Sequence, residues 1–263
     1  MCRDCGCAAH DGGHIVRHSQ GKEVASAAQG HRPVDEARVI SRLLAANDRA
    51  AHHNREHFDE LGILAINLMS SPGAGKTALL EATIERLGSE LRLAVIEGDL
   101  ETENDAARIR AKGVPAVQIT TGSACHLDAA MVHDALHELE LGDIDVLFIE
   151  NVGNLVCPAS FDLGQQLNVV LLSTTEGDDK PAKYPVMFRN SDLVVLTKTD
   201  LLPFLDDFRP DRATAALKAS GYGGPVLTTS ARNSAGMDEW LSWLRQSLAE
   251  RRHSRPSRRN NPL

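Results

Sequence analysis

The stretch Ser70-Ser71-Pro72-Gly73-Ala74-Gly75-Lys76-Thr77 stands between a buried apolar run, Ile63–Met69, and a run with helical spacing that begins at Lys76. Its glycines let backbone N–H groups turn inward without a Cβ in the way, and the helix N-terminus adds the positive end of its dipole. The stretch therefore predicts a phosphate-binding loop of the Walker A type, with Ser70 where that motif commonly has its first glycine.

The rest of the chain alternates between short apolar runs and helical segments. The apolar runs read as buried strands, each too apolar for a one-sided sheet: Ile63–Met69, Leu93–Ile96, Ala116–Ile119, Val146–Ile149, Asn168–Leu172 and Leu193–Leu196. Helical spacing covers the segments Lys76–Leu87, Asp105–Lys112, Leu127–Leu139, Arg212–Ala219 and Met237–Ala249. This order predicts an α/β P-loop fold with a mostly parallel central sheet flanked by helices on both faces.

The net charge and composition exclude several partners and fold classes. The chain has 263 residues, a net charge of −8, 42% hydrophobic and only 4% aromatic residues. The negative charge argues against nucleic acid as a partner, and the Ala/Leu/Val-rich composition argues against an all-β fold. No apolar stretch has the length of a membrane span or the form of a signal peptide, so we expect a cytoplasmic protein.

Two carboxylates at strand ends are candidates for holding Mg²⁺ on a bound nucleotide. Glu150 ends an apolar strand and is followed by Asn151-Val152-Gly153, an arrangement typical of a switch segment, and Asp99 lies just past the strand that ends at Glu97. Thr77 would offer its hydroxyl to the same ion, and Lys76 would bridge the β- and γ-phosphates. We therefore expect Lys76, Asp99 and Glu150 to be catalytic, and Thr77, Asp99 and Glu150 to hold magnesium; Asp99 could instead cap a turn.

The nucleotide base is predicted from a later motif. Leu196-Thr197-Lys198-Thr199-Asp200 follows an apolar strand, and Thr229-Ser230-Ala231-Arg232 follows another strand about thirty residues later. The Asp200 carboxylate can accept from guanine N1 and N2 together, a donor pair that adenine lacks. We expect guanine nucleotides to bind through the main chain of Gly73, Ala74 and Gly75 and the side chains or backbone of Lys76, Thr77, Lys198, Asp200, Ser230 and Ala231.

The five cysteines do not suit a disulfide framework, because their number is odd and three of them lie within the first seven residues. In a reducing compartment they are interpreted as metal ligands or reactive thiols. Cys2, Cys5 and Cys7 are close enough for one ion, and three thiolates with one nitrogen suit Ni²⁺ better than a tetrahedral Zn²⁺ site. Cys125-His126 and Cys157 could form a second site if the sheet brings their loops to one edge. From spacing alone, buried hydrophobic cysteines are the stronger interpretation.

Three regions are expected along the chain. Residues 1–33 form a flexible Cys/His-rich metal-binding tail. Residues 34–252 form a P-loop GTPase domain with a long leading helix from Val34 to about Glu60. Residues 253–263 form a basic disordered C-terminal tail.

Five stretches together resemble one family. The opening Met-Cys-Arg-Asp-Cys-Gly-Cys, the phosphate loop and the runs Glu97–Asp105, Glu150–Pro158 and Glu176–Pro181 resemble the hydrogenase nickel-incorporation GTPases, the HypB family. The resemblance implies a homodimeric GTPase of the signal-recognition/MinD-like class. Such a protein helps insert nickel into the [NiFe]-hydrogenase large subunit precursor, together with a HypA-type metallochaperone.

The same resemblance implies residue roles and ligands. Cys2, Cys5 and Cys7 would form a tight nickel site, and Cys125, His126 and Cys157 a second, nucleotide-sensitive site for nickel or zinc. Lys180 or Lys183 would take part in dimer contacts. The expected ligands are GTP or GDP, Mg²⁺, Ni²⁺ and, at the internal site, Zn²⁺ as an alternative.

Three other functions fit the sequence less well. A urease nickel-insertion GTPase would carry a contiguous Cys-Pro-His triplet, which the sequence lacks. A nickel-storage protein with a vestigial nucleotide site would not need the intact Lys76, Thr77 and Asp200. A P-loop small-molecule kinase would leave Asp200 and the tail cysteines without a role.

Overall fold

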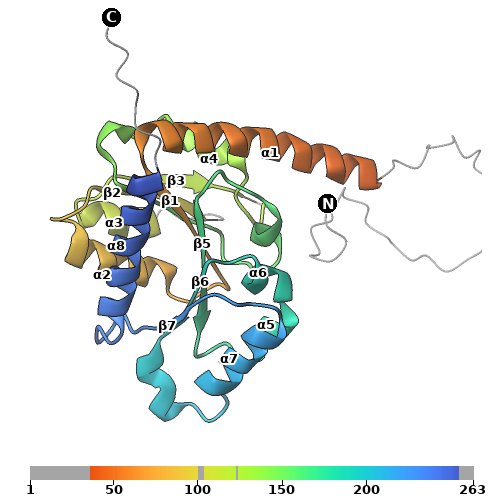
Figure 1. Ribbon diagram of the computed structural model, residues 1–263, viewed down its shortest axis with the longest axis vertical. Coiled ribbons are helices and arrows are strands. Elements are labelled where there is room, and N and C mark those ends of the chain that lie inside the picture. The colour runs from red at the N-terminus through yellow and green to blue at the C-terminus, as the bar shows by residue number, and fades with distance from the viewer. Residues whose placement is uncertain (1–35, 100–103, 123, 255–263) are drawn as a thin grey trace, which may run out of the picture. The chain divides into compact units, whose positions relative to one another are not determined.

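The computed structural model describes residues 36–99, 104–122 and 124–254, with side chains from residue 41 onward (Figure 1). The N-terminal tail with Cys2, Cys5 and Cys7 lies outside the described residues. Among the described residues, those up to Ala46 and those from Asn47 onward belong to separate units, and the first contains the beginning of helix α1. The second unit contains the sheet and the candidate sites described below.

A seven-stranded parallel sheet forms the centre of the larger unit, with the strand order β3-β2-β4-β1-β5-β6-β7. Its strands are β1 Leu64–Ser70, β2 Leu93–Asp99, β3 Ala116–Thr120, β4 Val146–Glu150, β5 Leu167–Ser173, β6 Leu193–Thr197 and β7 Val226–Thr228. All six predicted strands are confirmed, and β7 is the strand expected before Thr229. The predicted parallel α/β architecture is therefore confirmed.

The helices connect and cover these strands. They are α1 Glu36–Leu61, α2 Lys76–Leu87, α3 Asn104–Ala111, α4 Ala129–Leu136, α5 Lys180–Lys183, α6 Pro185–Arg189, α7 Pro210–Ala219 and α8 Met237–Ser254, with short 3-10 turns η1 Leu141–Asp143, η2 Cys157–Ser160 and η3 Thr199–Phe204. Within the described ranges, no helix combines the length and apolarity needed to cross a membrane.

Several helix boundaries differ from the prediction by one to five residues, and those of α4 and α8 bear on the expected site and tail. Helix α4 begins at Ala129, not Leu127, because Asp128 has extended backbone and its carboxylate accepts a 2.8 Å hydrogen bond from the N–H of Met131. Cys125 and His126 therefore lie in the loop before α4 and not at its start. Helix α8 continues beyond the expected end at Ala249 to Ser254, into the region expected to be a tail.

Helices lie on both faces of the sheet (Figure 1), and buried side chains of the strands pack against them. One face carries residues such as Ile66 and Phe148 and is covered by α2, α3 and α8. The other face packs against the end of α1 and α4 on one side, where Phe58 is fully buried, and against α6 and α7 on the other. Helices cover both faces of the sheet, so ligands can approach it at the ends of the strands. Folds of this kind bind ligands at the carboxyl ends of their parallel strands.

Helix α8 is fixed to α2 by one buried polar contact. Trp240 is fully buried, and its indole N–H donates a 2.9 Å hydrogen bond to Oγ1 of Thr83, which itself donates to the carbonyl of Leu79. A buried indole donor without an acceptor costs about 1–3 kcal/mol. This contact therefore contributes to holding the C-terminal helix on the phosphate-loop helix.

We predict that Thr83→Val lowers the free energy of unfolding by about 1–3 kcal/mol, because it leaves the Trp240 N–H unpaired without changing side-chain volume much. Urea denaturation measures the effect. Thr214→Val is the matched control, since the Thr214 hydroxyl also bonds a carbonyl four residues earlier, that of Pro210. Equal losses in both variants would contradict a specific role of the Trp240 contact.

Candidate functional site

The phosphate loop joins β1 to α2 in the expected form. Gly73 and Gly75 have positive φ angles of 72° and 97°, in the left-handed region that glycine alone adopts without strain. Lys76 is buried, and its ammonium donates a 3.1 Å hydrogen bond to Oγ of Ser70. Serine at the first position of the motif therefore holds the lysine that would meet the phosphates.

A pair of buried carboxylates lies beside this lysine. Glu97 of β2 and Glu150 of β4 are register partners on neighbouring strands. Glu150 Oε1 accepts a 3.0 Å hydrogen bond from Thr77 and lies 3.9 Å from the Lys76 ammonium. Glu97 is not among the residues that sequence reasoning selects, although its position at the end of an apolar strand was a usable signal.

Both carboxyl groups are held in an environment that disfavours charge. Burial and then the neighbouring Glu150 carboxylate raise the pKa of Glu97 far above 4.5. Burial also raises the pKa of Glu150, against the lowering effect of Lys76. Within the described residues, Glu97 Oε1 and Glu150 Oε2 have no hydrogen-bond partner, and such orphaned buried oxygens fit a hard cation such as Mg²⁺.

These groups line a cavity of about 210 Å³ between the phosphate loop and the ends of β2 and β4. Its walls also include Asp99, Asp105 and the segment Asn151–Gly153. Asp99, Glu150 and Lys76 thus share one cavity, while Thr77 reaches Glu150 from the adjoining helix. The donor set is rich in oxygen and has the composition that Mg²⁺ on a nucleotide phosphate requires.

A second cavity of about 270 Å³ lies on the other side of the phosphate loop. It contains Lys198, Asp200, Ser230 and Ala231, all expected base contacts, and Ala74 and Gly75 form its border with the loop. The Ser230 hydroxyl donates a 2.6 Å hydrogen bond to Oδ1 of Asp200 and so orients this carboxylate.

Thr197 stands where the common guanine motif has asparagine, and it contacts the phosphate loop directly. Its buried hydroxyl donates a 2.7 Å hydrogen bond to the carbonyl of Ala74. Lys198, with a left-handed φ of 58°, donates a 2.6 Å hydrogen bond from its ammonium to the carbonyl of Gly73. The base motif and the phosphate loop are therefore one connected structure.

Cys125, His126 and Cys157 are brought together, as a shared metal site requires. One ligand atom from each lies within 4.8 Å of the other two, and the two Sγ atoms are 3.0 Å apart. The His126 ring stacks on Phe161 at 3.9 Å, and burial lowers its pKa, which favours the neutral ring that binds metals. Two thiols and one imidazole form a donor set that suits Ni²⁺ or Zn²⁺.

The segment after β4 connects this thiol and imidazole site to the phosphate cavity. Asn151 Oδ1 accepts a 3.2 Å hydrogen bond from the N–H of Leu127, and Asn154 donates a 3.3 Å hydrogen bond to the carbonyl of Cys125. Gly153 lies directly on the phosphate loop, since a Cβ there would come within 2.7 Å of Pro72 Cα. A displacement of this segment would therefore reach both sites.

The two lysines expected in dimer contacts lie in the short helix α5. Lys183 pairs with Asp179 at 2.5 Å, and the Lys180 ammonium lies 5.5 Å from the centre of the Tyr184 ring. Nearby Asp178 is buried and accepts a 3.2 Å hydrogen bond from the N–H of Arg209.

The parallel sheet, the glycine-turned loop before α2 and the Asp200 cavity define a protein of the P-loop GTPase class. The family model described as "CobW/HypB/UreG, nucleotide-binding domain" matches residues 64–219. Hydrogenase maturation factor HypB of Azotobacter chroococcum mcd 1 is 51% identical over 232 residues, which are 87% of this chain and 76% of that protein. The chain belongs to the HypB family of hydrogenase maturation factors.

Two further HypB proteins are similar to this chain, one in sequence and one in structure. HypB of Escherichia coli strain K12 is 52% identical over 202 residues, 77% of this chain and 69% of that protein. The crystal structure of HypB from Helicobacter pylori in complex with nickel has a TM-score of 0.74 and 40% identity, covering 81% of this chain and 98% of that chain.

We predict that the ligand-free protein loses stability as pH rises above about 5, and that Glu97→Gln makes this loss smaller. Unfolded Glu97 ionises near 4.5, whereas the raised pKa keeps the folded carboxyl protonated. The folded state then binds more protons, so the free energy of unfolding falls with increasing pH. Urea denaturation between pH 5 and 9, in the presence of a chelator, measures the slope.

Glu90→Gln is the control for this measurement. Glu90 is exposed and its pKa is lowered by the hydrogen bond from Arg245, so its stabilising effect is lost only on acidification. Its replacement should leave the slope above pH 5 unchanged. If the free energy of unfolding falls with pH equally in Glu97→Gln and in the wild type, the folded protein does not hold an extra proton at Glu97.

Proposed function

We propose that this protein is a GTP-hydrolysing metallochaperone that carries nickel for insertion into the [NiFe]-hydrogenase large subunit. One observation supports this most strongly. The segment Asn151–Asn154 contacts both the phosphate loop and the loop that carries Cys125 and His126. A nucleotide cavity and a nickel-type donor set are thus joined by the segment that follows the β4 carboxylate.

Guanine recognition rests on Asp200. Its carboxylate, oriented by Ser230, would accept from guanine N1 and N2, and adenine offers no such donor pair. The Lys76 ammonium, now 3.1 Å from Ser70 Oγ, would turn to the β- and γ-phosphate oxygens. Hydrolysis then consists of water attacking the γ-phosphate while backbone N–H groups and Lys76 stabilise the developing charge.

Thr77, Asp99, Glu150 and Glu97 would hold Mg²⁺ in the phosphate cavity. When bound, the ion neutralises charge on the phosphate oxygens. Release of the shared proton from the carboxylate pair would accompany its binding, because ionised oxygens are the better ligands. Thr77 would then turn its hydroxyl from Glu150 Oε1 to the ion.

Nickel would bind as cargo at Cys125, His126 and Cys157. Thiolates and a neutral imidazole are suitable soft and borderline ligands. The H. pylori relative, crystallised in complex with nickel, supports the choice of nickel, and zinc is the alternative ion. Cys2, Cys5 and Cys7, outside the described residues, would form a separate nickel site.

The remaining parts of the proposal come from the family. They are homodimer formation with contacts from Lys180 or Lys183, exchange of metal with a HypA-type metallochaperone, and delivery to the hydrogenase large subunit precursor in the cytoplasm. If the internal site lies on a two-fold axis, metal binding would also favour the dimer.

We predict that Asp200→Asn lowers the preference for GTP over ATP by about 10–100-fold, equivalent to the ~1–3 kcal/mol of a misplaced buried polar group. The steady-state kcat/KM for both nucleotides, with Mg²⁺, measures the preference. Lys76→Ala should abolish turnover. Asp206→Asn, an exposed carboxylate on the same loop that does not line the cavity, is the control. Unchanged preference in Asp200→Asn, or equal use of ATP and GTP by the wild type, would refute guanine recognition by this residue.

A further inference from the structure

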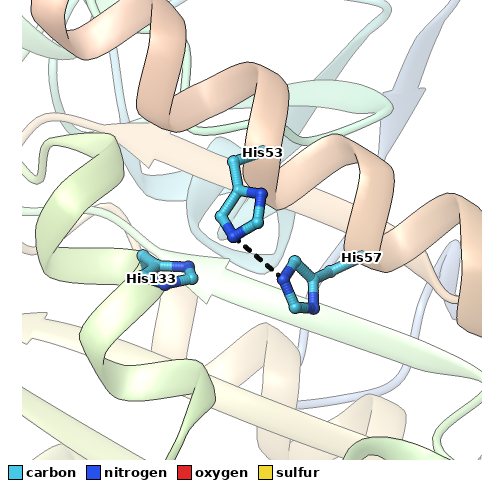
Figure 2. Close-up of side chains that lie close together, drawn as sticks. All are labelled: His53, His57 and His133. Atoms are coloured by element: carbon cyan, nitrogen blue, oxygen red, sulfur yellow. Dashed lines mark hydrogen bonds between the residues drawn. The ribbon is translucent and has the colours of Figure 1, made fainter.

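A cluster of histidines lies between α1 and α4, apart from the residues of the proposed nucleotide and thiol sites. His53 and His57 are one turn apart on α1, and His133 faces them from α4 (Figure 2). Each offers a ring nitrogen within 4.8 Å of the other two. The Nε2 atoms of His53 and His57 are 3.2 Å apart.

A fourth imidazole extends this histidine cluster. His137, at the C-terminal end of α4, has its Nε2 atom 3.2 Å from Nε2 of His133. The centre of the His133 ring lies 4.7 Å from the centre of the His137 ring and 4.9 Å from that of the His53 ring. His53 and His137 are exposed and His57 and His133 are partly buried, so the cluster is open to solvent on one side.

A buried asparagine fixes the proton on His133. Asn54 is fully buried, and its Nδ2 donates hydrogen bonds to the carbonyls of Ala129 at 2.8 Å and Leu163 at 3.0 Å. Both amide hydrogens are therefore used, and Oδ1 is left to accept from His133 Nδ1 at 3.1 Å. The proton is on Nδ1, so the Nε2 lone pair of His133 points into the cluster.

This arrangement is the one that metal-binding histidines show. Such a histidine donates its second ring N–H to an oxygen, which orients the ring and raises the basicity of the other nitrogen. The Glu56 carboxylate lies 3.7 Å from Nδ1 of His53, beyond hydrogen-bond distance. The Asn54 oxygen therefore favours Nε2 as the ligand atom of His133.

We propose that His53, His57 and His133, with His137 as a further ligand, bind one divalent transition-metal ion through imidazole nitrogens alone. Three or four neutral imidazoles suit Ni²⁺ and Zn²⁺ and disfavour Mg²⁺ or Ca²⁺, which prefer oxygen. Burial and then the rings of His137, His53 and His57 lower the pKa of His133, consistent with a neutral ligand. The site is independent of the proposed GTPase and of the thiol ligands.

The test is metal titration of the full-length protein at pH 7.5. Zn²⁺ and, separately, Ni²⁺ are titrated against a chromophoric chelator, and the bound metal is counted. The wild type should bind one more equivalent of metal than the double variant His53→Gln His133→Gln. Loss of both ligands should weaken that equivalent by about 100-fold or more, beyond the ~10–100-fold typical of a lost outer-shell partner. Which ion is retained at lower free concentration identifies the preferred metal.

Controls separate this site from the others. His52→Gln removes an exposed histidine of the same helix that contacts Glu56 but does not belong to the cluster, and it should bind metal like the wild type. Thiolate-to-nickel absorption should be equal in all variants, because the cysteines are intact. GTP turnover should also be equal.

A second variant tests the same site in case the double variant does not fold. His57→Gln alters one ligand without touching the Asn54 contact, and circular dichroism checks that each variant is folded. It should also lose the extra equivalent. If both folded variants bind as many Zn²⁺ and Ni²⁺ ions as the wild type, with the same affinities, the histidines bond only to one another and the proposal is wrong.

Discussion

The main chain of the phosphate loop is the constraint on which the rest of the site depends. Thr197 and Lys198 hold the carbonyls of Ala74 and Gly73 from one side, and Gly153 packs on Pro72 from the other. Residues more than seventy positions apart thus meet on one short turn. Its left-handed glycines leave backbone N–H groups available for phosphate, and any side chain at position 153 would push the loop away.

The carboxylate pair beside the loop explains how the site can respond to its ligand. Burial raises the pKa of both carboxyl groups, and the Glu150 carboxylate raises that of Glu97 further, so the ligand-free site favours holding a proton despite the nearby Lys76. A cation supplied with the nucleotide would replace that proton and satisfy the orphaned oxygens of Glu97 and Glu150. Because Glu150 directly precedes Asn151, exchange of the proton for a cation would change the charge at the start of the Asn151–Asn154 segment.

The sequence allowed most of this architecture to be predicted, because apolar runs of parallel strands and the loop at 70–77 have strong local signals. Several residues that the sequence singles out line the two cavities, among them Lys76, Asp99, Glu150 and Asp200. The sequence did not predict Glu97, whose importance depends on its register with Glu150, nor the role of Thr197, which depends on a contact with Ala74. The grouping of Cys125 with Cys157, and of His53 with His133, likewise depends on which helices and loops become neighbours.

We propose that the Asn151–Asn154 segment links the nucleotide to the metal at Cys125, His126 and Cys157. The most direct measurement is nickel affinity of the full-length protein with GDP and with a non-hydrolysable GTP analogue, each with Mg²⁺. The claim predicts different affinities in the two states. It also predicts that nickel changes the ratio of the affinities for analogue and GDP by the same factor, as linkage requires. Equal nickel affinities in both nucleotide states would contradict it.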